Sequence, residues 1–176
     1  MSYLNLLNNI TTFIFDVDGV LTNGTVILQP NGDQSRIMNI KDGFALQLAV
    51  KKGYRVAVIS GGTSETVRKR FAGLGIHDVY LGASEKWEAY QELLITYDLK
   101  PEEIAYMGDD IPDYQVLNDA GLGCCPNDAA VEIQQIAKYI SPLKGGEGCG
   151  RDIIEKVMRA QDKWFNPDVK DLSHQW

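Results

Sequence analysis

The sequence predicts an α/β fold: a doubly wound parallel sheet with helices on both faces and one β-hairpin insert. Short apolar, β-prone runs alternate along the chain with segments of helix length, which is typical of parallel strands joined by crossover helices. Pro30-Asn31-Gly32 interrupts this alternation between two β-prone runs and indicates a tight hairpin. The 176 residues contain no internal repeat and no interdomain linker. We therefore expect one domain over residues 1–165 and a polar tail over 166–176.

The β-prone runs have the lengths of strands in a sheet. The run 54–59 contains no turn residue and suits a strand that is buried on both faces. We expect sheet strands at 11–15, 54–59, 79–81, 104–107, 122–125 and 139–140, and hairpin strands at 25–28 and 34–40, so that the hairpin insert spans about residues 24–40.

The intervening segments carry helix start and stop signals. Asp42 is a candidate N-cap, Gly53 a candidate stop, and Pro112 fits a first helical turn. We expect helices at 42–52, 64–72, 84–97, 111–119, 128–136 and 151–161, with a flexible glycine loop at 145–150.

The composition argues against several classes of protein. The chain has 17 Lys and Arg against 24 Asp and Glu, a formal charge of −7, whereas nucleic-acid binders present a basic face. It has no run of 18 apolar residues, so we expect no membrane span. Three cysteines, two of them adjacent, are a poor disulfide framework, and the N-terminus lacks the features of a signal peptide. These observations predict a cytoplasmic protein.

Polar side chains follow three predicted strands at their carboxyl ends, where ligands bind in a doubly wound sheet. They are Asp16 and Asp18 after the first strand, Ser60, Gly61 and Gly62 after strand 54–59, and Asp109, Asp110 and Asp113 after strand 104–107. Carboxylates this close repel one another unless a cation lies among them. Oxygen ligands without His or Cys favour Mg²⁺ over zinc, so we expect a magnesium site.

Two carboxylates two residues apart can take different roles. Asp16 can attack phosphorus and form an aspartyl-phosphate, while Asp18, on the same side of an extended segment, can protonate the leaving alcohol and then deprotonate water. Ser60 can hydrogen-bond the transferring phosphoryl group, and Lys86 can neutralise its charge and hold Asp16 ionised. Each feature alone is common in turns, caps or solvated surfaces. The four in this order predict a phosphoryl-transfer site.

Four further residues are candidate substrate contacts. They are the backbone amides of Gly61 and Gly62 and the cations Lys41 and Arg70. No Walker pattern is present, so a nucleotide site is disfavoured.

At residues 15–22, Phe-Asp-Val-Asp-Gly-Val-Leu-Thr, the sequence strongly resembles the haloacid dehalogenase superfamily of phosphatases, whose folds are Rossmann-like. Residues 58–61 resemble its second motif, Lys86 its third, and residues 107–110 with Asp113 its fourth; the match spans about residues 10–160. Within the superfamily, the chain resembles the 3-deoxy-D-manno-octulosonate 8-phosphate phosphatases at residues 39–43, 106–113 and 145–148.

This resemblance implies Asp16 as nucleophile and Asp18 as acid and base. It implies Mg²⁺ held by Asp16, the backbone carbonyl of Asp18 and Asp109, with Asp110 or Asp113 in support. It also implies a role in lipopolysaccharide precursor synthesis and a homotetramer without a separate cap domain, in which one subunit's hairpin covers the next subunit's site. The short inserts between motifs agree with this, since a selective pocket still needs a wall that excludes water.

The sequence differs from this group at two positions, so the identity of the anionic sugar-phosphate substrate stays undecided. Glu147 and Gly62 occupy positions where many members of this group have Arg. The related phosphatases of nine-carbon keto-sugar acid 9-phosphates tend to have Glu at the Glu147 position, but also Glu at the Gly62 position. Two alternative functions come from other classes of protein. A receiver-like phospho-acceptor signalling domain would not need Asp18. A non-catalytic scaffold would not need the set Asp16, Asp18, Ser60, Lys86 and Asp109.

Overall fold

The computed structural model describes residues 3–165, in which six parallel strands form one sheet of order β5-β4-β1-β6-β7-β8. The strands are β1 (Thr12–Phe15), β4 (Arg55–Ile59), β5 (Asp78–Tyr80), β6 (Ile104–Met107), β7 (Leu122–Cys125) and β8 (Tyr139–Ile140). From the central β1 the chain continues to β4 and β5 on one side, then returns to build β6, β7 and β8 on the other. The predicted doubly wound α/β fold is confirmed.

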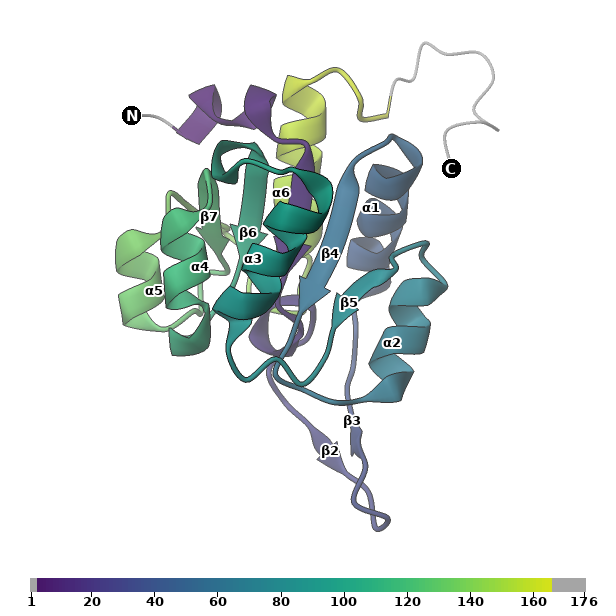
Figure 1. Ribbon diagram of the computed structural model, residues 1–176. Helices are drawn as coiled ribbons and strands as arrows, with labels where there is room; N and C mark the ends of the chain where they lie inside the picture. The colour runs from purple at the N-terminus through teal and green to yellow at the C-terminus, as the bar shows by residue number, and fades with distance from the viewer. Residues whose placement is uncertain (1–2, 166–176) are drawn as a thin grey trace.

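Helices cover both faces of the sheet, and Figure 1 shows α3 in front of it and α6 behind it. The helices α1 (Ile40–Lys51), α2 (Glu65–Ala72) and α6 (Cys149–Ala160) contribute to one apolar cluster. The helices α3 (Lys86–Tyr97), α4 (Tyr114–Asp119) and α5 (Val131–Ile136) contribute to the other. Short helical turns lie at Tyr3–Asn5, Leu7–Asn9, Val17–Leu21, Pro101–Glu103 and Ile111–Asp113. Of the helices that the structure describes, none has the length and apolar character needed to cross a membrane.

The strands alternate between the two clusters, as a period of two residues requires. In β1, Phe13 and Phe15 belong to the cluster under α1 and α6, whereas Ile14 belongs to the cluster under α3 and α4. All four residues of β1 are buried. Two-sided burial explains why Phe13, Ile14 and Phe15 follow one another with no polar residue between them.

Several element boundaries differ from the prediction. The N-cap of α1 is Asn39 rather than Asp42, because the Asn39 side chain accepts a hydrogen bond from the Lys41 N–H at 2.8 Å. Asp42 is instead buried, and its Oδ1 accepts the Arg151 N–H at 2.7 Å. The helices α3 and α5 begin two and three residues later than predicted, whereas α6 begins at Cys149, inside the predicted glycine loop.

The hairpin is shorter in regular structure than predicted and projects away from the body at the carboxyl end of the sheet (Figure 1). Its strands β2 (Ile27–Leu28) and β3 (Gln34–Ser35) pair antiparallel over two residues each. The predicted strand 34–40 is wrong beyond Ser35, because Met38 forms an isolated bridge with Thr22 and Ile40 begins α1. The predicted tail 166–176 lies outside the described residues, and the division at residue 165 stays a prediction.

Candidate active site

The site lies where the direction of chain winding reverses. Strand β1 is paired with β4 on one side and β6 on the other, so the loops after these three strands meet at one edge. Asp16 directly follows β1, and its N–H donates to the carbonyl of Met107 at 3.0 Å. Ser60 follows β4, and its N–H donates to the carbonyl of Tyr80 at 2.9 Å. Backbone hydrogen bonds from the sheet therefore fix both residues.

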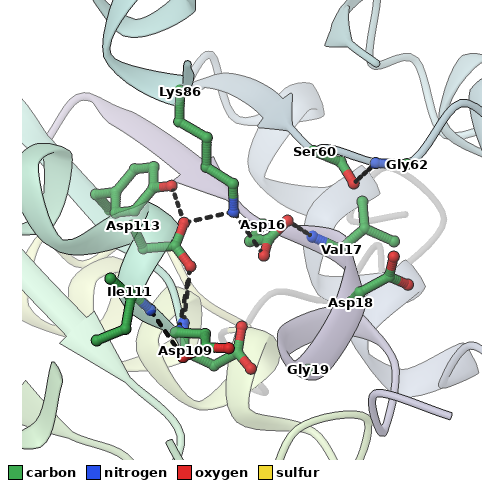
Figure 2. Close-up of polar contacts among 12 residues, drawn as sticks. Asp16, Val17, Asp18, Gly19, Ser60, Gly62, Lys86, Asp109, Ile111 and Asp113 are labelled. Carbon is green, nitrogen blue, oxygen red and sulfur yellow. Dashed lines mark hydrogen bonds and ion pairs between the residues drawn. The ribbon is translucent and has the colours of Figure 1, made fainter. Parts of the chain in front are cut away.

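Lys86 joins two buried carboxylates (Figure 2). Its Nζ lies 2.7 Å from Asp16 Oδ2 and 2.6 Å from Asp113 Oδ1, and all three residues are buried. Burial lowers the pKa of Lys86, but the charges of the two carboxylates outweigh burial and leave this pKa above its ordinary value. The other Asp16 oxygen, Oδ1, accepts the Val17 N–H at 2.6 Å. The structure thus brings together two residues that the sequence predicts as partners, Asp16 and Lys86.

Asp113 orients this cluster. Its Oδ1 accepts hydrogen bonds from Lys86 and from the Tyr106 hydroxyl, and its Oδ2 accepts the N–H groups of Asp109 at 3.1 Å and Asp110 at 3.3 Å. Because these contacts tie Asp113 to Lys86, Tyr106 and the loop after β6, we infer that it positions Lys86 and that loop.

Asp16 and Asp109 form the best candidate metal site. With Asp113 they offer oxygen atoms that all lie within 4.8 Å of one another. Asp109 Oδ1 is buried and has no hydrogen-bond donor within the described part of the chain. Burial raises the pKa of Asp16 to about 7; the charge of Asp113 also raises this pKa, and that of Lys86 lowers it. Burial also raises the pKa of Asp109 to about 7, and the charges of Asp16 and Asp113 act in the same direction. Repelling carboxylates and an unpaired buried oxygen fit a hard divalent cation.

The segment after Asp16 kinks within Val17–Leu21. Asp18 has extended backbone angles (φ −74°, ψ 121°), and Gly19 turns the chain with φ +84°. A Cβ on Gly19 would lie 2.0 Å from Asp109 Oδ2, so only glycine allows the turn to pass so close to the metal site. Figure 2 shows the Asp18 carboxylate pointing away from Lys86 and Asp113.

Asp18 is instead paired with Arg36 of the hairpin. Arg36 Nε lies 2.6 Å from Asp18 Oδ1, and Arg36 Nη2 lies 2.9 Å from Asp18 Oδ2, which is a bidentate ion pair. Arg36 was not among the site residues that the sequence predicted. The available signal was that it is the only Lys or Arg in residues 24–40, a segment expected to reach an anion site.

A cavity of about 900 Å³ lies between the hairpin and the loop after β4. Its lining includes Arg36, Gly61, Gly62 and Arg70. The Gly62 N–H donates to Ser60 Oγ at 3.1 Å, which holds the loop and its serine together. Three predicted substrate contacts therefore share one cavity beside the reaction site.

Two predicted site residues stand apart. Lys41 lines a different depression, of about 580 Å³, together with Glu147 and Arg151. Asp110 is exposed, and its Oδ1 caps the next turn by accepting the Ile111 N–H at 2.8 Å. Within the described residues, neither side chain joins the cluster around Asp16.

Comparison with known proteins gives the family. Residues 71–150 match the haloacid dehalogenase-like hydrolase model. The 3-deoxy-D-manno-octulosonate 8-phosphate phosphatase of Yersinia pestis is 36% identical over 155 residues, which cover 88% of this chain and 83% of that protein. The enzyme of the same name from Escherichia coli K12 is 36% identical, over 88% of this chain and 82% of that protein.

Solved structures agree with this. The Yersinia pestis phosphatase superimposes with a TM-score of 0.89 and 34% identity, over 91% of this chain and 86% of that chain. The Moraxella catarrhalis phosphatase, in complex with magnesium, phosphate and the sugar acid, has a TM-score of 0.87 and 30% identity over 90% and 91% of the chains. The cobalt-bound Haemophilus influenzae phosphatase has a TM-score of 0.85 and 32% identity over 89% and 88%. This chain therefore belongs to the haloacid dehalogenase-like hydrolases, and it is a phosphatase of the group that contains the 3-deoxy-D-manno-octulosonate 8-phosphate phosphatases.

Proposed function

We propose that the chain hydrolyses 3-deoxy-D-manno-octulosonate 8-phosphate to the free sugar acid and inorganic phosphate, a step of lipopolysaccharide precursor synthesis. The observation that carries the proposal is the buried Asp16–Lys86–Asp113 cluster next to a cavity lined by two arginines. The relatives of that name, 36% identical over most of their length, support this choice of substrate.

In the first step, a carboxylate oxygen of Asp16 forms a bond to phosphorus and the bond between phosphorus and the sugar oxygen breaks. Asp18, protonated and released from its ion pair with Arg36 when the substrate binds, donates a proton to that leaving oxygen, which departs as the alcohol. Lys86 favours the ionised form of Asp16 and offsets charge on the phosphoryl group, while the Ser60 hydroxyl can donate a hydrogen bond to that group.

In the second step, Asp18 takes a proton from water. The water oxygen forms a bond to phosphorus, and the bond between phosphorus and Asp16 breaks. Inorganic phosphate leaves, Asp16 returns as a carboxylate, and Asp18 is protonated for the next turnover. The two carboxylates thus take separate roles in the two steps.

Mg²⁺ would be held by Asp16 and Asp109, with Asp113 orienting the loop. When bound, it neutralises charge on the phosphoryl oxygens and allows both aspartates to stay ionised together. The unpaired Asp109 Oδ1 supports this site, as does the presence of magnesium or cobalt in structures of related phosphatases.

We also propose that the chain acts in the cytoplasm as a homotetramer with shared sites. The three cysteines are free and buried, which suits a reducing compartment. The hairpin exposes Ile27, Leu28 and Ile37, and a neighbouring copy that covered them would also close the open side of the cavity.

The substrate is tested by offering the eight-carbon 8-phosphate and a nine-carbon keto-sugar acid 9-phosphate side by side with Mg²⁺. We expect a higher kcat/KM for the eight-carbon acid, measured as phosphate release. A preference for the nine-carbon acid would overturn the assignment. Acetyl-phosphate labelling that persists for minutes would instead point to a phospho-acceptor domain.

A further inference from the structure

Arg36 brings a cation from the hairpin to the reacting end of the cavity. It is bound bidentately to Asp18, the residue proposed to protonate the leaving oxygen. A group held against Asp18 therefore lies on the leaving-group side of phosphorus, away from Lys86 and Asp113. This placement suits contact with the sugar rather than with the phosphoryl oxygens.

The loop after β4 leaves room for this guanidinium. A Cβ on Gly62 would lie 3.2 Å from Arg36 Nη2 and 3.5 Å from both Asp18 Oδ2 and Ser60 Oγ. A larger side chain at Gly62 would therefore crowd the guanidinium. The position of the Arg36 guanidinium therefore depends on the absence of a side chain at Gly62.

The guanidinium of Arg36 still has donor capacity for a ligand. Of its five N–H groups, two bind Asp18 and one on Nη1 binds the Gln34 carbonyl at 3.0 Å. The remaining contact from Nη2, to Gln34 Oε1, is 3.5 Å long and therefore weak. A carboxylate of the substrate can replace it and also use the remaining Nη1 hydrogen.

The other cation of the cavity is placed differently. Arg36 and Arg70 are the basic residues among the described residues that line it. Arg70 Nη2 lies against the first turn of α1, where a Cβ on Gly43 would be 2.4 Å away. The carboxylates Asp33 and Glu65 also line the cavity, so a cation is needed there before an acidic sugar can enter.

We propose that Arg36 is a specificity-determining residue that binds the carboxylate of a sugar-acid leaving group. Before the substrate binds, Asp18 positions its guanidinium, and Gly62 provides the space for it. This inference rests on the proposed function, and it deepens that function by naming the residue that distinguishes an acidic sugar phosphate from a neutral one.

The test compares two substrates that differ by a single charge: 3-deoxy-D-manno-octulosonate 8-phosphate and its C1 carboxamide. We expect the wild type to prefer the carboxylate by about 10- to 100-fold in kcat/KM, the range for one hydrogen-bonded charged group. In Arg36→Met this ratio should fall to about 3 or less, with the loss mainly in KM for the acid. Arg36→Lys should retain part of the preference, since it keeps the positive charge but loses the planar guanidinium that can bind a carboxylate through two hydrogen bonds.

Two further variants act as checks. Gly62→Ala keeps Arg36 but crowds its guanidinium, so the preference should be reduced. Arg159→Met removes an exposed arginine of α6 that pairs with Glu155, and it should keep the wild-type ratio. Thermal melting of each variant shows whether the fold is retained.

A binding measurement separates this inference from the proposed function. Calorimetric titration with the free sugar acid should show about 10- to 100-fold weaker binding in Arg36→Met, while binding of inorganic phosphate stays unchanged. An equal loss on both substrates, or a loss of phosphate binding instead, would overturn the role of Arg36. A wild type that binds the acid through Arg36 but releases phosphate from neither substrate would contradict the proposed function alone.

Discussion

The two ends of the active site are built differently. At one end, Asp16, Lys86 and Asp113 are held by the sheet and by one another, and the Asp113 side chain is 0% exposed. At the other end, the ion pair of Asp18 and Arg36 joins a tight turn to a projecting hairpin, and the Asp18 side chain is 37% exposed. The buried end is fixed before substrate arrives, as transition-state stabilisation requires. The open end, where the Asp18 side chain is partly exposed, is the part that can adapt to a substrate or a neighbouring subunit.

The largest expected effect comes from removing the nucleophile at the buried end. In Asp16→Asn an amide replaces the attacking carboxylate, so kcat should fall by about 10⁴-fold or more, measured as phosphate release. Asp98→Asn is the matched control, because Asp98 is an exposed C-cap with φ 50°, a conformation that Asn tolerates. Retention of more than about a tenth of the wild-type rate would contradict the assignment of Asp16.

Removing the cation of the buried end should affect both stability and rate. Lys86→Met leaves two facing carboxylates buried without their partner, which should cost about 3–5 kcal/mol in the free energy of unfolding at neutral pH. The rate should also fall by about 100-fold. Lys52→Met at the exposed end of α1 is the control. Unchanged melting and activity in Lys86→Met would show that the cluster is dispensable.

Stability should depend on pH in a way that reveals the repulsion at the buried end. Burial raises the pKa of Asp16 and Asp109 from 3.8 to about 7, so the folded protein keeps protons that the unfolded chain has lost. Without divalent cations, the free energy of unfolding should therefore fall as pH rises from about 5 to about 8. Mg²⁺ should remove most of this loss, because a bound cation favours both ionised carboxylates.

The measurement is the melting temperature across this pH range, with EDTA or with Mg²⁺. Asp42 contributes a component that Mg²⁺ should not remove, since burial raises its pKa to about 6 at a place held by Arg151 rather than by the metal site. A melting temperature that rises with pH in EDTA, or that falls equally with Mg²⁺ present, would contradict the metal assignment.

The smallest effect is expected at the open end, through assembly. Leu28 is 74% exposed on β2, and Leu28→Asp should weaken contacts with a neighbouring copy. Light scattering should show a smaller mean mass, with about a threefold loss of kcat/KM at low protein concentration. Ile95→Asp on α3, where Ile95 is 81% exposed, is the matched control. A fully active wild-type monomer would rule out shared sites.

Much of the buried end could be predicted from the chain. Parallel strands present their carboxyl ends at one edge, so the acidic loops after β1 and β6 had to meet, and the structure brings Asp16 and Asp109 together. The direction of Asp18 could not be predicted in the same way. It depends on the kink at Asp18 and Gly19, where glycine adopts a positive φ and, having no Cβ, leaves room for Asp109.

Residues on helix starts and on the hairpin were the hardest to place. Lys41 is the second residue of α1, where the sequence predicted a position before the helix, and it lines a separate depression. Arg36 could not be predicted, because the alternation along a hairpin strand indicates which face of the hairpin a side chain lies on. It does not indicate the direction in which the hairpin leaves the sheet.

The sequence by itself determined the sheet, its helices and the acidic strand ends, since hydrophobic periodicity and turn chemistry act over a few neighbouring residues. Only the tertiary structure decided two further charge pairs: Lys86 meets Asp113 across 27 positions, and Arg36 meets Asp18 across 18. The physical reason is that such a pair forms only where packing brings two distant segments within hydrogen-bond distance. No local pattern along the chain records that distance.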